Sequence, residues 1–152
     1  MVAGGFSGQI TAWAAETKQR MKAVRDTSVE RVVETAQTLA PTDTGFLRSS
    51  VVATINDVPV ARERPDGEAR YTYSSGPIVL VIDGAALDDT LIVSWTANYA
   101  RYVEFGARGR PARRFVGMAV QQWPQIVAQA AAELQGNVQG RQAIAVYQGG
   151  AL

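Results

Sequence analysis

The chain contains no cysteine and no histidine among its 152 residues. Without cysteine it cannot form disulfides, thiolate nucleophiles or cysteine-ligated zinc sites. Without histidine it lacks the usual proton shuttle of neutral pH and the base of a Ser-His-Asp triad. Any catalysis would therefore rest on carboxylates, lysine, tyrosine or a hard metal ion. The sequence predicts no cofactor and favours a protein that is not an enzyme.

Charge is also sparse, with 19% charged residues and a net charge of +1 beside 47% hydrophobic residues. A domain whose main task is to bind phosphates usually has an overall basic excess, which this chain lacks. The low charge suggests surface that is covered by neighbouring copies or partners, although an average soluble domain rich in alanine and glycine fits equally well.

Signals for secretion or membrane insertion are missing from the sequence. The N-terminus has no basic start and no apolar run, and the longest uncharged stretch, 115–132, holds four glutamines and a proline. We therefore expect no membrane partner, and a protein that stays in the cytoplasm where it is made.

A long helix is predicted near the N-terminus. Apolar residues recur at steps of three or four from Ile10 to Leu39, Ser7 is a candidate N-cap, and Pro41 ends the pattern. Thirty helical residues span about 45 Å. Because a domain of this size does not need such a length, we expect one end to overhang.

Strand patterns follow this helix, beginning at Leu47 and continuing to Ile55. Residues 56–75 predict a projecting β-hairpin turning at 65–67, the apolar run 77–82 predicts a central strand, and 91–96 predicts a strand antiparallel to it. The fold class is thus α+β: an antiparallel meander of about three to four strands, with the long N-terminal helix and a C-terminal helix on one face.

Two acidic turns are candidate binding sites. In 42–45, Asp43 can bond the following backbone N–H groups and Gly45 can take a positive φ, and a plain helix-to-strand connector is favoured over a ligand site. Asp88 and Asp89 could hold a metal, but a solvated loop tip is favoured and we expect no metal site.

The stretch 98–115 stands out because it contains five arginines. It also contains three aromatic residues, and a fourth, Phe115, ends it. Its spacing predicts a short helix with Tyr99, Tyr102 and Val103 on one side, Phe105 packing at its end and Gly106 as a left-handed exit residue. Glu104 is expected to form a salt bridge with nearby arginines, in preference to acting as a general acid.

The arginines of this stretch have three possible roles: a solvated loop, contacts with phosphates, or contacts with acidic groups on another protein copy. Arginine throughout, with no lysine, favours planar bidentate pairing over mere solubility. A protein partner is preferred. The candidate interface residues are Arg101, Glu104, Arg108, Arg110, Arg113 and Arg114.

A second amphipathic helix is predicted from Phe115 to Leu134, with a kink or a restart at Pro124 and an end at Gly136. The remaining residues, 137–152, carry one charge and a short apolar run, which predicts an extended tail that is disordered or adds a strand to a neighbouring subunit. The predicted organisation is one domain, 1–136, followed by this tail.

Two motifs together resemble the tail-completion, or neck, proteins of long-tailed bacteriophages and prophages. The first, Pro41-Thr42-Asp43-Thr44-Gly45-Phe46-Leu47-Arg48-Ser49-Ser50, is similar to the family pattern P-x-D-T-G-x-L-R-x-S. The second, Tyr99-Ala100-Arg101-Tyr102-Val103-Glu104-Phe105-Gly106, is similar to Y-A-x-x-x-E-F-G, and an Arg-Pro loop follows at 110–111. The chain departs from the family at Ala112, where an aromatic residue is common.

The resemblance implies a non-enzymatic virion protein that forms a ring, of six copies in the family, between the head connector and the tail tube, with double-stranded DNA passing through. Its partners would be other copies of itself, the tail tube and tail terminator proteins, and a head connector or head-closure protein. Alternatives are a tail terminator that caps the tube, or a small DNA-binding module using the same arginines.

Overall fold

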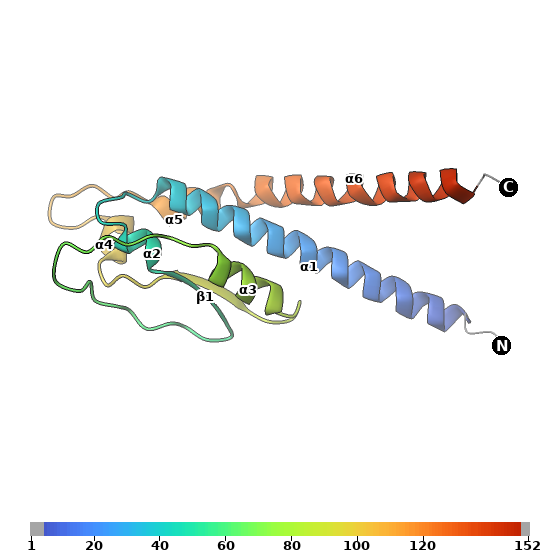
Figure 1. The fold of residues 1–152 in the computed structure, drawn as a ribbon, viewed down its shortest axis with the longest axis horizontal. Helices are drawn as coiled ribbons and strands as arrows, with labels where there is room; N and C mark the ends of the chain where they lie inside the picture. Colours follow the sequence, from blue (N-terminus) through green and yellow to red (C-terminus); the bar gives the residue numbers. More distant parts are fainter. Residues whose placement is uncertain (1–4, 150–152) are drawn as a thin grey trace.

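The computed structural model describes residues 5–149, and the side chains of residues 5–136. Its elements are α1 (Phe6–Leu39), α2 (Phe46–Ser49), β1 (Val51–Ile55), α3 (Gly76–Gly84), β2 (Leu91–Trp95), α4 (Ala100–Phe105), α5 (Phe115–Gln121) and α6 (Trp123–Gly149). In Figure 1 the helices α1 and α6 lie above the sheet and diverge toward the N- and C-terminal ends of the chain, and both extend beyond the rest of the body.

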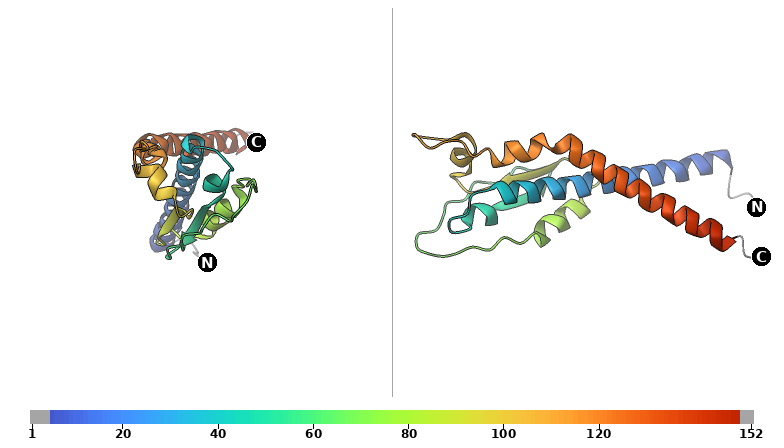
Figure 2. Two further views of the ribbon diagram at one scale, coloured as in Figure 1. Left: turned by 90° about the vertical axis from the view of Figure 1, so that its left-hand side faces the viewer. Right: turned by 90° about the horizontal axis from the view of Figure 1, so that it is seen from above.

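Helix α1 is the central element of the fold. Viewed end-on in Figure 2, it lies between α5 and α6 on one side and the sheet with α3 on the other. Its 34 residues confirm the predicted long helix, although it begins one residue before the expected cap. Gly5, not Ser7, is the N-cap residue, and Ser7 lies within the helix.

The sheet has two strands in the described part of the chain, where three or four were expected. Strands β1 and β2 pair antiparallel, with Val51 opposite Trp95 and Ile55 opposite Leu91. The strand predicted at 91–96 is therefore confirmed, but its partner is β1. The strand predicted from Leu47 begins only at Val51, because Leu47 belongs to the short helix α2.

The predicted central strand 77–82 is wrong, because these residues form helix α3. Pro77 occupies the first turn, where its missing N–H costs nothing. Ile78 and Ile82 are buried, but Leu80 is 74% exposed. A strand would place all three side chains on one face, whereas a helix places only residues four apart together. A short apolar run fits either element by pattern alone.

The predicted hairpin at 56–75 is also wrong. These residues form an extended loop, visible in Figure 1 as the long green segment, whose arms do not pair with each other. Instead, Arg62 bridges to Ala97 beside the end of β2, and Tyr71 N–H donates to Thr44 O. The expected turn glycine, Gly67, does have a positive φ of 116°. Polar arms with little to bury gain more by docking onto the body than by pairing in solvent.

The break predicted at Pro124 is confirmed, since α5 ends at Gln121 and α6 begins at Trp123. The end predicted at Gly136 is wrong, because α6 continues through Gly149 and residues 137–149 are helical where an extended tail was expected. The last three residues of that predicted tail lie outside the described residues, and the single-domain assignment for 1–136 stays a prediction.

Two buried clusters hold the body together. One joins α1, α2, α4 and α5 through Ala36, Phe46, Ala100 and Phe115, and Trp95 packs edge-on against Phe115 with ring centroids 5.4 Å apart. The other joins α1, the sheet and α3 through residues that include Val33, Val51, Ile78 and Ile82. Both clusters lie on the C-terminal half of α1, so its N-terminal part forms the expected overhang (Figure 1).

Candidate functional site

The first motif forms the sharp turn between α1 and α2. Gly45 takes a φ of 86°, as predicted, and a Cβ there would lie 2.2 Å from Tyr71 O. Glycine therefore allows the 56–75 loop to pack directly on this turn. Asp43 does not cap the turn as expected; the Thr44 hydroxyl instead accepts the Phe46 N–H at 3.4 Å.

Arg48 of this motif fastens the end of α1. Its Nε and Nη2 donate to Ala40 O at 3.1 and 2.8 Å, which satisfies a carbonyl that the helix leaves unpaired. The buried Gln37 donates to Arg48 O at 2.7 Å and accepts the Trp95 Nε1–H at 3.0 Å. Arg48 thus has a structural role that joins α1, α2 and the sheet.

The second motif forms α4 and its exit. Gly106 has a φ of 81°, as predicted, and a Cβ there would lie 2.9 Å from Arg110 O, so the following loop folds back tightly. Val103 packs against the core. The packing expected for Phe105 is wrong, because this side chain is 74% exposed, and Tyr102 is 60% exposed.

Glu104 does not form the expected salt bridge within the described residues. Its two carboxylate oxygens accept the backbone N–H groups of Val116 and Gly117 at 2.9 and 2.8 Å. These donors belong to the first turn of α5, where the helix dipole favours a negative charge. Glu104 is therefore a helix cap, and it fixes α5 to α4. The residue before α5, Arg114, has a positive φ of 46°.

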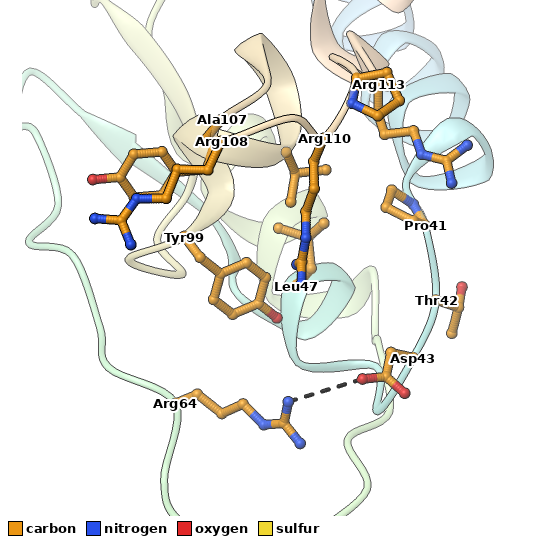
Figure 3. Close-up of a pocket in the computed structure, with 13 residues that line it drawn as sticks. Pro41, Thr42, Asp43, Leu47, Arg64, Tyr99, Ala107, Arg108, Arg110 and Arg113 are labelled. Carbon is orange, nitrogen blue, oxygen red and sulfur yellow. Dashed lines mark ion pairs between the residues drawn. The ribbon is translucent and has the colours of Figure 1, made fainter.

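The two motifs meet at an open groove of about 1050 Å³, which we call the arginine groove. It lies between the α1–α2 turn, α4 and the loop 106–114 (Figure 3). Its lining combines arginines with apolar and aromatic side chains: Pro41, Thr42, Asp43, Leu47, Arg64, Tyr99, Tyr102, Val103, Ala107, Arg108, Arg110, Pro111 and Arg113. The sequence did not predict that the motifs converge.

The groove gathers three of the five predicted interface arginines, namely Arg108, Arg110 and Arg113. In Figure 3 the Arg110 side chain extends toward Leu47, and Arg113 lies beside Pro41. Arg101 and Arg114 are exposed but do not line the groove. Within the described residues none of these five arginines pairs with a carboxylate.

The groove has a strong positive bias. Its lining has four arginines and a single carboxylate, that of Asp43, which lies 3.9 Å from Arg64 with both side chains exposed to solvent. Such an exposed pair contributes little. Burial raises the pKa of the Tyr99 hydroxyl, so this group stays neutral at physiological pH. The groove can therefore bind an anionic group between guanidinium ions while apolar atoms contact its remainder.

Sequence reasoning missed Arg64, which comes from the loop 56–75 that was expected to project as a hairpin. No local signal places it at the groove, because its position depends on long-range contacts such as that of Tyr71 with Thr44. The motif residues Thr44, Gly45, Arg48, Ala100, Phe105 and Gly106 do not line the groove.

The described residues offer neither a metal site nor a membrane-spanning helix. Among the described residues, no three acidic side chains gather in a way that could hold a metal ion. Asp89 instead accepts the Asn56 amide and the Ala86 N–H, and these hydrogen bonds lower its pKa. None of the described helices combines the length and apolar character that a membrane span needs.

Comparison with known proteins gives one match. A family profile described as "Bacteriophage HK97-gp10, putative tail-component" matches residues 6–106, which include α1, both motifs and both strands. No curated protein and no solved structure matches the chain. The matched region covers well over half of the sequence, and it ends at the last residue of the second motif. The chain therefore belongs to the HK97-gp10-like family of bacteriophage tail components.

Proposed function

We propose that this tail component is a structural protein of the phage neck, a tail-completion ring that joins the tail tube to the head connector around the DNA channel. The observation that carries the proposal is the arginine groove, in which the loop 106–114 and the loop 56–75, far apart in sequence, bring four guanidinium groups together. A groove built in this way is suited to contact with acidic groups on another virion protein. The chain performs no catalysis in this account.

The loop 106–114 is fixed by backbone contacts that leave its arginine side chains free. Arg113 and Arg114 are fixed through their backbone, by hydrogen bonds from their N–H groups to Val103 O and Glu104 O at 2.8 and 3.1 Å. Their side chains take no part in these bonds. The loop therefore presents positive charge at a defined place at little cost in ordering on binding.

A second surface that supports assembly is the overhanging part of α1. Phe6, Ile10, Trp13 and Met21 are 48–78% exposed, at steps of three, four and eight residues. These steps place them on one side of the helix. An exposed apolar stripe of this kind marks a contact with another protein. In a ring, each copy must show two different patches to its neighbours, and the stripe and the groove lie on different parts of the fold.

Near-neutral charge suits a passage for DNA. The net charge of the whole chain is +1. A ring whose lumen neutralised many phosphates would bind DNA tightly and slow its passage. In this account the arginines face protein partners and the duplex passes without specific binding.

The test is deletion of the gene in the phage that encodes this chain, followed by electron microscopy of the lysate and mass spectrometry of purified virions. The proposal predicts the protein in wild-type virions, and DNA-filled heads beside unjoined tails of normal length in the deletion. Normal joined particles from the deletion would refute it.

A tail terminator is the alternative within the tail, since the family assignment covers tail components in general. The length of the tail tube in the deletion distinguishes a tail terminator from a tail-completion ring. A missing terminator leaves the end of the tube uncapped and should produce tails of abnormal length, whereas a missing completion ring leaves length unchanged.

A DNA-binding module is the alternative outside assembly, and the four arginines of the groove are the observation that favours it. Titration with duplex DNA at two salt concentrations tests it. Phosphate contacts by four arginines predict an affinity that falls steeply with salt, with a logarithmic slope of about −3.6. Our proposal predicts weak binding with no dependence on sequence.

A further inference from the structure

The end of the body opposite the arginine groove is acidic. It is formed by the last turn of α3, the loop between α3 and β2 and the loop that follows β1, and it carries Asp57, Asp83 and Asp88 as exposed side chains. The two loops are tied together by Asn56, which donates to Asp89 and accepts the Thr90 N–H at 2.9 and 2.8 Å. These three aspartates form no ion pair within the described residues. We call them the acidic end.

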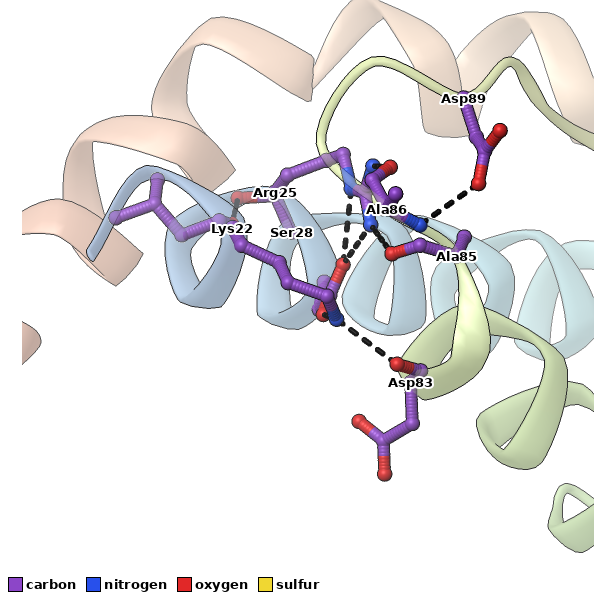
Figure 4. A network of polar contacts seen from close by, with 9 residues as sticks. Lys22, Arg25, Ser28, Asp83, Ala85, Ala86 and Asp89 are labelled. Carbon is purple, nitrogen blue, oxygen red and sulfur yellow. Dashed lines mark hydrogen bonds and ion pairs between the residues drawn. The ribbon is translucent and has the colours of Figure 1, made fainter. Parts of the chain in front are cut away.

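The cations nearest to the acidic end already have partners. Lys22 bonds Asp26 at 2.6 Å and the backbone oxygen of Asp83 at 3.0 Å. Arg25 bonds Asp26 and the backbone oxygens of Ala85 and Ala86. Figure 4 shows this network and the Asp83 carboxylate pointing away from Lys22.

The negative field of Asp83 is felt elsewhere in the molecule. Burial first, and then the charges of Asp83, Asp26 and Glu34, raise the pKa of Glu30.

The groove cannot reach the acidic end of its own chain. Arg25 fixes the acidic end to the middle of α1, whereas Pro41 lines the groove just beyond the end of α1. The fourteen steps from Arg25 to Leu39 span about 21 Å of helix at 1.5 Å per residue. Unpaired charges of opposite sign thus lie at opposite ends of one nearly neutral body.

We propose that the arginine groove of one copy receives the acidic end of a second copy, with Arg110 and Arg113 facing Asp83 and Asp88. The inference rests on the proposed ring and names the partner of the groove within it. A contact between two different patches is head-to-tail, and it forms a closed ring when the rotation between copies closes.

The test uses two full-length charge-reversal variants, Arg110→Glu with Arg113→Glu, and Asp83→Lys with Asp88→Lys. Association of the purified protein is followed by sedimentation and native mass spectrometry at low and high salt. The wild type should self-associate at low salt and dissociate as salt rises, because exposed charge pairs are screened. Each variant alone should associate about 30-fold more weakly or worse, because attraction is replaced by repulsion.

The mixture of the two variants is the decisive arm. The first variant has an acidic groove and an acidic end, and the second has a basic groove and a basic end, so only unlike copies can pair. The mixture should therefore recover association, in assemblies that contain both variants in equal numbers. One chain carrying all four reversals should recover it as well.

The matched control is Asp66→Lys with Glu68→Lys, at exposed positions that neither line the groove nor belong to the acidic end, and it changes the net charge by the same amount as the acidic-end variant. It should associate as the wild type does. Circular dichroism of every variant checks that it is folded.

A folded wild type that stays monomeric at low salt, or a mixture no more associated than its components, would overturn the head-to-tail pairing. Such a result is separate from failure of the proposed function. The gene deletion could still leave unjoined heads and tails while the copies meet through another surface.

Discussion

Glu104 and Gly117 are joined by a 2.8 Å hydrogen bond from the Gly117 N–H to the Glu104 carboxylate, which also accepts the Val116 N–H. Glu104 therefore connects α4 to α5 and fixes both ends of the loop 106–114. We expect Glu104→Ala to lower the free energy of unfolding by about 1.5–3 kcal/mol, because two charge-assisted hydrogen bonds at a helix N-terminus are lost.

Urea denaturation measures this loss. Glu104→Gln is the matched control, since it keeps an oxygen acceptor and should be affected about half as much. Equal stability of the Ala variant and the wild type would show that the cap has no structural role.

Gly45 should tolerate no side chain. Gly45→Ala places a Cβ 2.2 Å from Tyr71 O at a φ of 86°, so the 56–75 loop must move. We expect a loss of stability of about 2–4 kcal/mol. Gly67→Ala is the control, because it has a positive φ of 116° with open space around it, and should cost about 1 kcal/mol. Thermal melts that rank the two variants equally would contradict the close approach of loop and turn.

The side-chain amide of Gln37 should contribute to the stability of the folded protein. Gln37→Leu leaves the Trp95 indole N–H and the Arg48 carbonyl without their partner in a buried place. We expect a loss of about 2–4 kcal/mol. Gln125→Leu, at an exposed position of α6, should change stability by less than about 0.5 kcal/mol. A neutral Gln37→Leu variant would mean that the two groups find other partners.

The pKa of Glu30 gives a dependence of stability on pH. Because the folded state raises this pKa above the usual 4.5, the folded protein binds the proton more tightly than the unfolded chain. The contribution of Glu30 to stability is thus full below about pH 4.5 and is lost as pH rises through its higher folded-state pKa. Glu30→Gln should raise the melting temperature at about pH 7 and have little effect at about pH 4. Glu63→Gln, on the exposed loop, is the control. A Glu30→Gln variant with a lower melting temperature than the wild type at neutral pH would contradict a raised pKa of Glu30 in the folded state.

The long helix α1, strands β1 and β2, the exit at Gly106 and the break before Pro124 could all be predicted, because each has a local cause. The causes act over a few residues: apolar periodicity for α1, alternation of β-branched residues for the strands, a glycine that tolerates positive φ at Gly106, and the missing N–H of Pro124. The helix α3 could not be predicted in this way. Its buried pair, Ile78 and Ile82, is defined only by packing against α1 and the sheet.

The candidate site was predicted in its parts but not in its arrangement. The arginines of the stretch 98–115 were identified from their residue type, whereas the groove depends on α2 and on Arg64, which tertiary contacts bring to it. Glu104 shows the same limit. Its neighbours in sequence suggested a salt bridge, and its partners are backbone groups twelve and thirteen residues away.

The central claim is that the arginines of the loop 106–114 join virion proteins to one another. Its most direct test is complementation of a gene deletion with a chain in which Arg108, Arg110, Arg113 and Arg114 are all replaced by Ala, with Arg70→Ala as control. We predict that the quadruple variant is folded in solution but yields unjoined heads and tails, while Arg70→Ala yields wild-type titres. Wild-type numbers of infectious particles from the quadruple variant would contradict the account.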